Sequence, residues 1–560
     1  MPTASTDPIE GVPETVREEL AVETEGQADR IVAAAPPHAT EELNPLRWFI
    51  LIGLITAAIL QVLDTTIVNV ALPQMAGNLG ATSEEIGWVV TGYILSNVIV
   101  LPMTAFLTTR FGRKRYLTAS ILIFIISSFF CGTSVSLPEI VFWRILQGAG
   151  GAALLSTSQA TLVQVFPRRE QGLVQALFMM SLTVAPTLGP TLGGYITDNY
   201  TWNWCFLINV PIGIAAVILV MTFLHDVEPP SRSVAIDWPG IGLLAVGLGT
   251  MQYVLEEGQR DDWFQSNLIV WLTLLSAVCL LTLVWWQLSR RNRAPIIDFR
   301  VLKNRTLSAS LFLFVVLGFG VYGGTYLFPL VAQNVLGFTS LQTGLALLPG
   351  GIATGGSILV CGALMNRPTA SVDPRIIIVA GTLVTIASMW QLGHMSIDSG
   401  SGDTTIALLL RGLGMGLLFV PINQVAFAVL KKSELQQASG LLNLSRQLGG
   451  SFGIALLATY VQQHLQLHRV EMLRNFAMSN DIFTQRLQAI AGGLGAYGMS
   501  PADAHVAALG VLERMMMRQA TVMSYNDAFL VMLIVNTITL PAVFLLRNAK
   551  QAIHVEMVMD

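Results

Sequence analysis

Long apolar runs separated by short polar connections repeat along the chain from residue 48 onwards. A helix needs roughly 20 apolar residues to cross a bilayer, and runs of about this length recur. The pattern predicts about fourteen membrane-spanning helices, at residues 48–72, 86–107, 116–134, 139–163, 172–195, 205–224, 238–255, 268–288, 307–331, 343–365, 375–394, 405–429, 437–461 and 527–546. We therefore expect an all-α membrane protein.

The amino-acid composition agrees with this prediction. Hydrophobic residues make up 53% of the 560 residues and charged residues only 12%, and the mean hydropathy is +0.61. Soluble domains carry about twice this charged fraction. The four cysteines fall in or beside apolar runs and form neither a disulfide framework nor a CxxC metal pair. We expect no metal, no cofactor and no nucleic-acid partner.

Asp64 is an acid deep inside the first apolar run. Placing a carboxylate there costs roughly 2.5–3.5 kcal/mol on insertion scales, and acids inside the membrane are usually functional for that reason. The position indicates that Asp64 carries a proton during transport.

Polar segments divide the chain into expected domains. Residues 1–44 contain ten acids against Arg17 and Arg30, which predicts a disordered, acidic cytoplasmic tail over 1–47 rather than a signal peptide. The other expected parts are a six-helix bundle at 48–224, an extra helix pair with a linker at 225–306, a second six-helix bundle at 307–546 that includes an extracytoplasmic segment at 462–526, and a tail at 547–560.

Lys and Arg cluster in alternate connections. They follow the second, fourth, eighth, tenth, twelfth and fourteenth runs, whereas the connections 73–85, 135–138, 196–204, 332–342 and 395–404 contain none. The positive-inside rule then places both termini in the cytoplasm, and the long segment 462–526 lies outside because long loops cross regardless of charge. We expect a multi-pass protein of the cytoplasmic (inner) membrane.

The two expected bundles repeat one another. Pro73 precedes Arg110 by 37 residues, and Pro329 precedes Arg367 by 38. The sequence RILQGAG from Arg144 likewise matches RGLGMG from Arg411. Repeated halves are typical of secondary transporters, whose substrate site lies near the midplane between them.

Several motifs together resemble a known family. They are LQVLDTTIVNVALP (60–73), RFGRK (110–114), R-x-x-Q-G at Arg144, APTLGPTLGG (185–194) and WNWCFLINVPIG (202–213). The combination resembles the drug/proton antiporters of the major facilitator superfamily. With the extra helix pair it is similar to the fourteen-span EmrB/QacA-type group, and most similar to EmrB-like multidrug efflux pumps.

This resemblance implies the major facilitator fold and proton-driven export of apolar, often cationic compounds, with Asp64 and Arg144 in proton coupling. It also implies a periplasmic adaptor and an outer-membrane channel as partners, with segment 462–526 as the contact. The motif or gating residues would be Arg110, Gly112, Arg113, Gln147, Gly148, Pro186, Gly189, Pro190, Gly193 and Gly194. Ala105 and Thr109 stand where the family often has Gly and Asp, so an equal alternative makes Arg110 and Arg113 ordinary positive-inside charges.

Depth along the helices supports the pairing of Asp64 with Arg144. At 1.5 Å per residue, Asp64 lies roughly 13 Å below Pro73, and Arg144 lies roughly 9 Å below Pro138. A nearby guanidinium favours a charged carboxylate, whereas desolvation without it favours the neutral acid. A conformational change in this contact would therefore load or release a proton; the alternative is a static ion pair. The second half has Gly320 at the position of Asp64, so proton transfer is expected in the first half only.

The fifth helix combines Pro186 and Pro190 with Gly189, Gly193 and Gly194. Glycine allows close helix packing, and proline removes a backbone hydrogen bond. We expect a pliable helix at the seam between the halves, although small-residue packing alone explains the glycines. Asn69, Arg411, Asn423 and Gln424 are candidates for a substrate cavity, with a structural role as the alternative.

The sequence thus predicts a proton-coupled exporter of amphipathic small molecules, not an enzyme. Two alternative functions are export of a specific endogenous metabolite or siderophore, and passive facilitated transport. A membrane-embedded enzyme would need acids in its outer loops, and the outer connections 135–138 and 332–342 contain none.

Overall fold

The computed structural model describes residues 46–82, 85–225, 236–292, 295–365, 373–397, 399–430, 434–474 and 481–546, and the regular structure in these ranges is helical. The chain divides into two compact units, Met1–Trp48 and Phe49–Asp560. Only Leu46, Arg47 and Trp48 of the first unit are described, so the tails expected at 1–47 and 547–560 lie almost wholly outside the described residues. The second unit contains all of the features below.

The first expected bundle consists of α-helices joined by short connections, and its second expected span is broken by a 3₁₀ turn. Its helices are α2 (Arg47–Leu79), α3 (Trp88–Val100), η2 (Leu101–Met103), α4 (Thr104–Phe111), α5 (Arg113–Thr133), α6 (Leu137–Val165), α7 (Arg168–Asn199), α8 (Trp204–Leu207) and α9 (Asn209–Phe223). The first run was expected to end at Pro73, but α2 continues through this proline to Leu79.

The extra pair and the second bundle follow in the expected order. They comprise α10 (Trp238–Glu257), α11 (Asn267–Leu288), α12 (Arg305–Asn334), α13 (Ser340–Met365), α14 (Pro374–Leu392), α15 (Ser401–Ala428), α16 (Leu435–Arg474), α17 (Asp481–Ala496), α18 (Pro501–Thr537) and α19 (Thr539–Val543). Short 3₁₀ turns, η1 (Glu85–Gly87), η3 (Trp263–Gln265) and η4 (Phe299–Lys303), lie in the connections.

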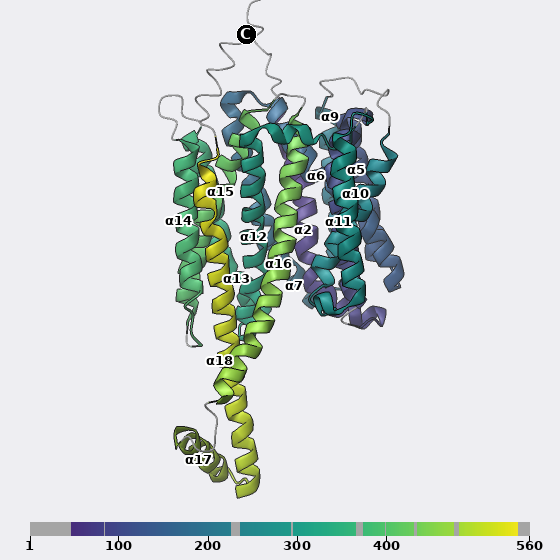
Figure 1. The fold of residues 1–560 in the computed structure, drawn as a ribbon. Helices are drawn as coiled ribbons and strands as arrows, with labels where there is room; N and C mark the ends of the chain where they lie inside the picture. The colour runs from purple at the N-terminus through teal and green to yellow at the C-terminus, as the bar shows by residue number, and fades with distance from the viewer. Residues whose placement is uncertain are drawn as a thin grey trace, which may run out of the picture. The chain divides into compact units, whose positions relative to one another are not determined.

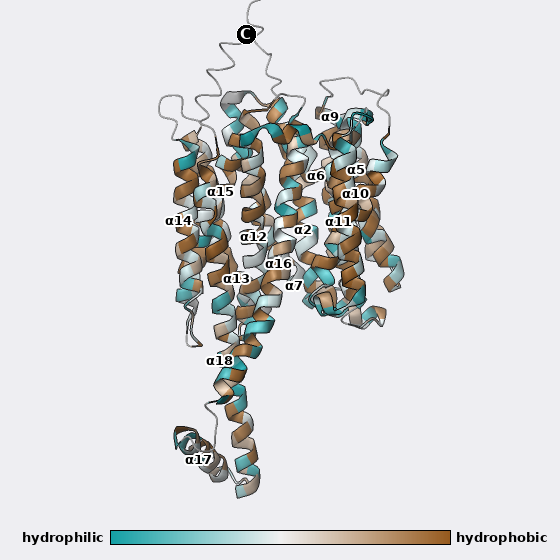
Figure 2. Cartoon of the chain, in the orientation of Figure 1, coloured by the Kyte–Doolittle hydropathy of each residue, from teal (hydrophilic) through white to brown (hydrophobic). Residues whose placement is uncertain are grey.

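Twelve helices in the described ranges are long and apolar enough to cross a membrane, which makes this a multi-pass membrane protein. The expected fourth and thirteenth spans, α6 and α16, are not among these twelve. Both carry buried polar side chains, including Arg144 in α6 and Arg446 in α16. Apolar residues cover most of the helices in Figure 2, whereas the ends of α16 and α18 next to α17 alternate between polar and apolar residues.

One end of the helices carries a projecting hairpin. The far parts of α16 and α18 run side by side past the other helices, and α17 packs against α18 near the tip (Figure 1). We call this part, residues 462–526, the hairpin, and the two ends of the helices the hairpin end and the loop end. Leu487 of α17 packs on Ala508 and Leu512 of α18 in a small apolar cluster. The hairpin therefore has a core of its own.

The extra helix pair connects the two halves. On α10, Glu257 accepts a hydrogen bond from Thr91 of α3 at 3.4 Å, and Gln252 donates to Ser451 of α16 at 2.8 Å. The pair itself is held by Asp237, whose carboxylate accepts four hydrogen bonds, from Gly240 N, Trp286 Nε1, Gln287 Nε2 and Asn292 Nδ2.

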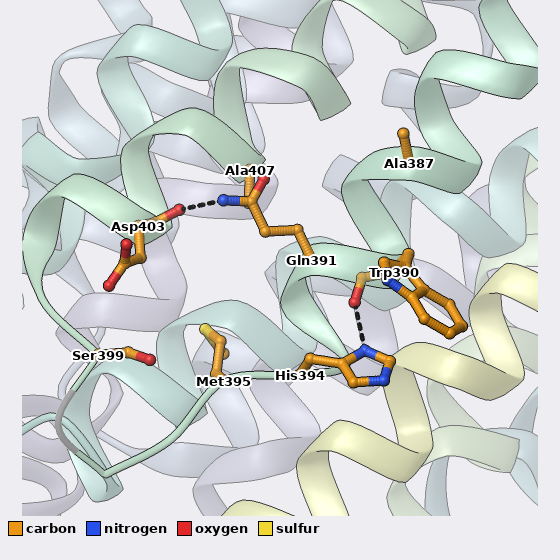
Figure 3. A pocket seen from close by; sticks show the side chains of 8 residues that line it. All are labelled: Ala387, Trp390, Gln391, His394, Met395, Ser399, Asp403 and Ala407. Atoms are coloured by element: carbon orange, nitrogen blue, oxygen red, sulfur yellow. Dashed lines mark hydrogen bonds between the residues drawn. The ribbon is translucent and has the colours of Figure 1, made fainter.

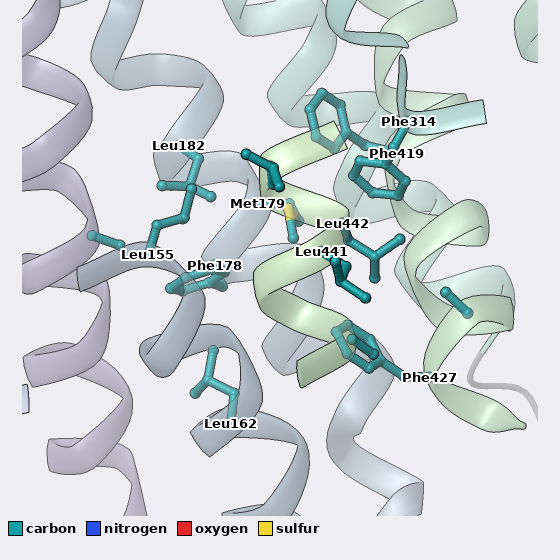
Figure 4. Packing of buried hydrophobic residues seen from close by; sticks show 14 of the residues in the cluster. Leu155, Leu162, Phe178, Met179, Leu182, Phe314, Phe419, Phe427, Leu441 and Leu442 are labelled. Atoms are coloured by element: carbon teal, nitrogen blue, oxygen red, sulfur yellow. The ribbon is translucent and has the colours of Figure 1, made fainter. Parts of the chain in front are cut away.

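The largest apolar core also crosses between the halves. Figure 4 shows Met179 of α7 beside Phe419 of α15 and Leu441 of α16. Packing of α7 against α13 adds a second contact, where a Cβ on Gly362 would lie 2.6 Å from Cβ of Ala176. The halves are therefore in close contact in this conformation.

Candidate functional site

Asp64 lies in the middle of α2 and is fully buried. The apolar sequence on both sides of it forms one continuous helix, which places its carboxylate inside the first bundle and away from water. A buried carboxylate needs partners because an isolated charge in such surroundings is very costly.

Arg144 of α6 supplies the expected partner. Its Nη1 donates to Oδ2 of Asp64 at 2.5 Å, and both side chains are buried. The α6 helix starts at Leu137 with Pro138 in its first turn, which sets the depth of Arg144 as the sequence predicted. Nε of Arg144 donates to the carbonyl of Val89 on α3 at 2.8 Å, so the guanidinium joins three helices.

Two amides complete the shell around the carboxylate. Gln147, one turn after Arg144, donates to Oδ1 of Asp64 at 2.9 Å and accepts from Arg144 at 2.9 Å. Asn209, at the start of α9, also donates to Oδ1 at 2.9 Å and to Ser128 at 3.1 Å. Asp64 therefore accepts three hydrogen bonds from α6 and α9.

Aromatic rings and a tight helix crossing surround the pair. The guanidinium of Arg144 lies over the ring of Tyr93, 4.3 Å from its centroid, and 5.6 Å from that of Phe206. At Gly148 a Cβ would lie 2.2 Å from the carbonyl oxygen of Tyr93. Glycine at this position lets α3 approach α6 closely enough for Tyr93 to cover the arginine.

The hydrogen bonds around Asp64 favour its charged form. All three donors stabilise the charged carboxylate, and the bond from Arg144 is charge-assisted. A proton on Asp64 would convert one acceptor oxygen into a donor, so protonation requires the contact with Arg144 or an amide to open.

The second half repeats the arginine but not the acid. Arg411 of α15 donates through Nη2 to the carbonyls of Val321 and Gly320 on α12, at 2.9 and 3.5 Å. Gly320 is the residue that matches Asp64 in the repeat. The two arginines thus reach equivalent levels of equivalent helices, and among the described residues only Arg144 meets a carboxylate.

A polar network joins the halves at the loop end. Gln159 of α6 donates to Oδ1 of Asn423 on α15 at 2.6 Å and accepts from Asn443 and Ser439 of α16, at 3.0 and 3.3 Å. A further bond from Gln436 to Thr157 measures 3.1 Å. Asn423, expected near a substrate cavity, lies here in a closed contact between the bundles.

The glycines of α7 mostly face α2 within the first half. A Cβ on Gly189 would lie 2.0 Å from Oγ1 of Thr66, and one on Gly193 would lie 2.8 Å from the carbonyl of Ile67. Gly194 has no neighbour within 4 Å of that position. Pro186 and Pro190 are both inside the helix, which continues through them.

The other predicted residues are more scattered. Arg110 ends α4 and Arg113 begins α5, with Gly112 between them at φ +84°, a conformation that favours glycine. Asn69 is exposed, and Gln424 is partly buried. No contact among the described residues places either next to Asp64.

A separate pocket of about 550 Å³ lies between α14 and α15 near the hairpin end. Figure 3 shows Trp390, His394 and Asp403 around it. It shares no residue with the Asp64 network. Within the described ranges, no three His, Cys, Asp or Glu side chains gather in a way that could hold a metal ion.

Sequence reasoning missed Asn209 and Gln159 as members of these networks. Asn209 stands in a motif noted for its family resemblance, but its pairing with Asp64 depends on how α9 packs. Its one local signal is an amide at the start of an apolar helix that contains Pro211. Gln159 has no comparable local signal, because its partners are more than 260 residues away.

The family model of the Major Facilitator Superfamily matches residues 54–454. Fatty acid resistance protein FarB of Neisseria gonorrhoeae is 32% identical over 503 residues, 90% of this chain and 96% of FarB. Multidrug export protein EmrB of Escherichia coli K12 is 32% identical over 480 residues, 85% of this chain and 91% of EmrB. Colistin resistance protein EmrB of Acinetobacter baumannii is 28% identical, covering 88% of this chain and 94% of that protein.

Among solved structures, the human organic anion transporter MFSD10 has a similar fold. The TM-score is 0.54 at 13% sequence identity, with 88% of this chain and 99% of the other covered. At this identity the likeness concerns the fold alone.

Proposed function

The chain belongs to the major facilitator superfamily, in its EmrB-like branch, and on this premise we propose that it is a proton-coupled antiporter that exports amphipathic drugs or toxic small molecules. Membership makes it a transporter rather than an enzyme. The names of its relatives, which include multidrug export and resistance proteins, support a broad substrate range.

The observation that carries the proton coupling is the buried Asp64–Arg144 pair. Nothing in a passive pathway requires a fully buried carboxylate, whereas a proton carrier requires one titratable group that changes surroundings during the cycle. Asp64 is held by α6 and α9 at once, so a relative shift of these helices changes its shell.

The loop-end network supports alternating access. Gln159, Asn423 and Asn443 close the contact between the halves on that side, and their bonds must break for the site to open there. We propose that proton binding at Asp64 and opening at the loop end are coupled through α6, which carries Arg144 and Gln147 in one part and Gln159 further along.

For the cellular arrangement we propose an inner-membrane protein with both termini in the cytoplasm. The loop end would then be cytoplasmic and the hairpin extracytoplasmic. A hairpin with a small core of its own supports contact with a periplasmic adaptor and, through it, an outer-membrane channel. The energy source would be the proton gradient, with no cofactor.

Substrate-induced proton release from reconstituted vesicles tests this proposal. Wild type should release protons when substrate is added, and Asp64→Asn, which keeps the size but cannot titrate, should not. Exchange of substrate down its own gradient should survive in Asp64→Asn because it needs no proton. Proton-coupled transport by Asp64→Asn would refute the assignment, and Glu139, at the start of α6, would be examined next.

A passive facilitator would move substrate in wild type without any response to the pH gradient. An exporter of one metabolite or siderophore would couple to protons but protect cells lacking their own pumps against few compounds in a toxic panel. These two results separate the alternatives from multidrug export.

A further inference from the structure

Glu256 is an acid of the extra helix pair that takes no part in the Asp64 network. It lies in the last turn of α10, a helix that packs against α3 of the first half and α16 of the second. Its carboxylate accepts a hydrogen bond from Nε2 of Gln252 at 2.8 Å, and no cation among the described residues forms an ion pair with it. The side chain is only partly exposed. Withdrawal from water without a nearby cation favours the neutral form of an acid.

The side chain of Gln252 lacks a donor next to this carboxylate. It is fully buried, and its Nε2 donates both to Glu256 and to Ser451 of α16, each at 2.8 Å. Oε1 of the same amide has no partner among the described residues. Buried amide oxygens are normally hydrogen-bonded, but an ionised carboxylate can only accept. A proton on Glu256 would supply the donor, because a carboxylic acid and a primary amide can form two hydrogen bonds with each other.

The charged groups around Glu256 do not take the place of a proton. Glu257 follows it in the chain and adds a like charge, and Arg260 pairs with Glu257 at 2.9 Å. The other titratable groups that face α10 are Tyr253 and Asp261 near its end and Cys279 of α11 beside Gly247, and α3 and α16 present the hydroxyls of Thr91 and Ser451. None of these groups is a cation that could neutralise Glu256.

We propose that Glu256 is a second proton-binding site, separate from Asp64, and that its carboxyl O–H donates to Oε1 of Gln252. The proton joins one carboxylate oxygen and later leaves it, so no other covalent bond forms or breaks. A proton needs no cavity, only an oxygen that can bind it and an acceptor beside that oxygen. This inference goes beyond the single proton site of the proposed function and rests on that function only for the part of Glu256 in transport.

Helix α3 connects the two proton sites. Thr91 of α3 donates to Glu257 at the end of α10, at 3.4 Å. On the same helix, the carbonyl of Val89 accepts from Arg144, and the ring of Tyr93 covers the guanidinium of Arg144. Helix α3 therefore contacts the end of α10 and the first proton site at once. Movement of α10 on protonation would reach the first site through this helix.

Infrared difference spectroscopy on the full chain in lipid vesicles tests the proposal without transport. A protonated carboxyl group has a C=O stretching band that disappears when the group ionises. Asp64→Asn is the background, so that the first site cannot contribute. Adding Glu256→Gln should remove a band that persists to higher pH than the band removed by Asp262→Asn. Asp262 is the matched control because it is exposed and has φ +55°, which asparagine tolerates.

A second variant tests the role of the amide while the acid remains. Gln252→Leu removes the hydrogen bond to the carboxyl group of Glu256, so the C=O band of Glu256 should move to higher frequency. Glu256→Gln keeps the size of the side chain and an acceptor for Nε2 of Gln252, and thermal unfolding would show that both variants are folded. In transport assays, Glu256→Gln alone should release fewer protons per substrate than wild type.

Several outcomes would overturn the inference. Identical spectra with and without Glu256→Gln, or a band that titrates with that of Asp262, would make Glu256 an ordinary ionised acid. An unshifted band in Gln252→Leu would mean that the amide does not accept the proton. An unchanged proton count in Glu256→Gln would remove Glu256 from the transport cycle. Export without proton release by wild type would count against the proposed function alone, because the spectra need no substrate.

Discussion

The carboxylate of Asp64 is fully hydrogen-bonded inside the bundle because donors from two helices reach both of its oxygens. Removing one partner of a buried pair typically costs about 3–5 kcal/mol, because the other charge is left uncompensated. Asp64 differs from Arg144 in that it can relieve such a cost by taking up a proton. In the proposed cycle, the acid is therefore the member of the pair that takes up and releases the proton.

Counting residues from Pro73 and Pro138 at the rise of an α-helix predicted this pair, because one uninterrupted helix places each of Asp64 and Arg144. The same count could not find Asn209 or Gln159. Their contacts depend on helix rotation and on packing between distant segments, which no local periodicity encodes. It also could not show that Arg411 meets backbone carbonyls, because the sequence shows only that Gly320 lacks an acid.

At the residue scale, Asn209→Ala should shift the pH dependence of uphill export to higher pH. The substitution removes one donor to the charged form of Asp64 and so favours the protonated form. A hydrogen bond to a charged group contributes about 1.5–3 kcal/mol. The measurement is the initial export rate against pH. Asn199→Ala, an exposed amide bonded only to the carbonyl of Tyr195, is the control, and an unchanged profile in Asn209→Ala would contradict the role of Asn209.

At the scale of single helices, α7 matches the predicted pliable helix in sequence but presents its glycines to α2. The contact between halves on this side is made by glycines of α13, such as Gly355 opposite Met180. Periodicity located the small residues, but which neighbour they face is decided by the packing of all the helices together.

Gly189→Leu should leave the protein in the membrane but block uphill export. Even a Cβ at this position collides with Thr66, two residues from Asp64, and overpacking typically costs about 1–3 kcal/mol. The matched control is Gly194→Leu on the same helix, because no atom lies within 4 Å of a Cβ there. Export and thermal stability would be measured for both. Equal export by the two variants would show that the α2–α7 contact does not matter for transport.

The loop-end network on α6, α15 and α16 gives a second prediction at this scale. Gln159→Ala removes three bonds between the halves, each contributing about 1 kcal/mol, so the loop end should open more often. Hydrogen–deuterium exchange at 435–446 should then be at least about tenfold faster. Gln171→Ala is the control because Gln171 bonds only to Val163 and Phe166 within the first half. Similar exchange in both variants would mean that other contacts keep the halves closed.

At the scale of the whole molecule, the hairpin separates into a part that supports the bundle and a part that does not. Arg518 donates to the carbonyl of Val335 at 2.9 Å, and His468 bonds Asp527 at 2.7 Å. Beyond these contacts, α17 packs on α18 through the cluster around Leu487. The segment 462–526 expected from sequence as one outer unit therefore includes residues that the second bundle needs.

The part of the hairpin that does not contact the bundle can therefore be removed to test the proposed contact with an adaptor. Arg469 and Glu513 face each other across α16 and α18 at 3.6 Å, so a short Gly/Ser turn can replace residues 472–511 without removing the partners of His468 and Arg518, which include Glu471 and Asp527 for His468. The shortened protein should transport substrate in vesicles like wild type and fail to give resistance in whole cells. Replacing exposed Tyr497 and Val506 (91% and 70% exposed) with Ser keeps the hairpin fold and should reduce resistance in the same selective way. Equal loss in vesicles and cells would make the hairpin a structural element of the pump, and normal resistance in the shortened protein would remove the hairpin from any partner contact.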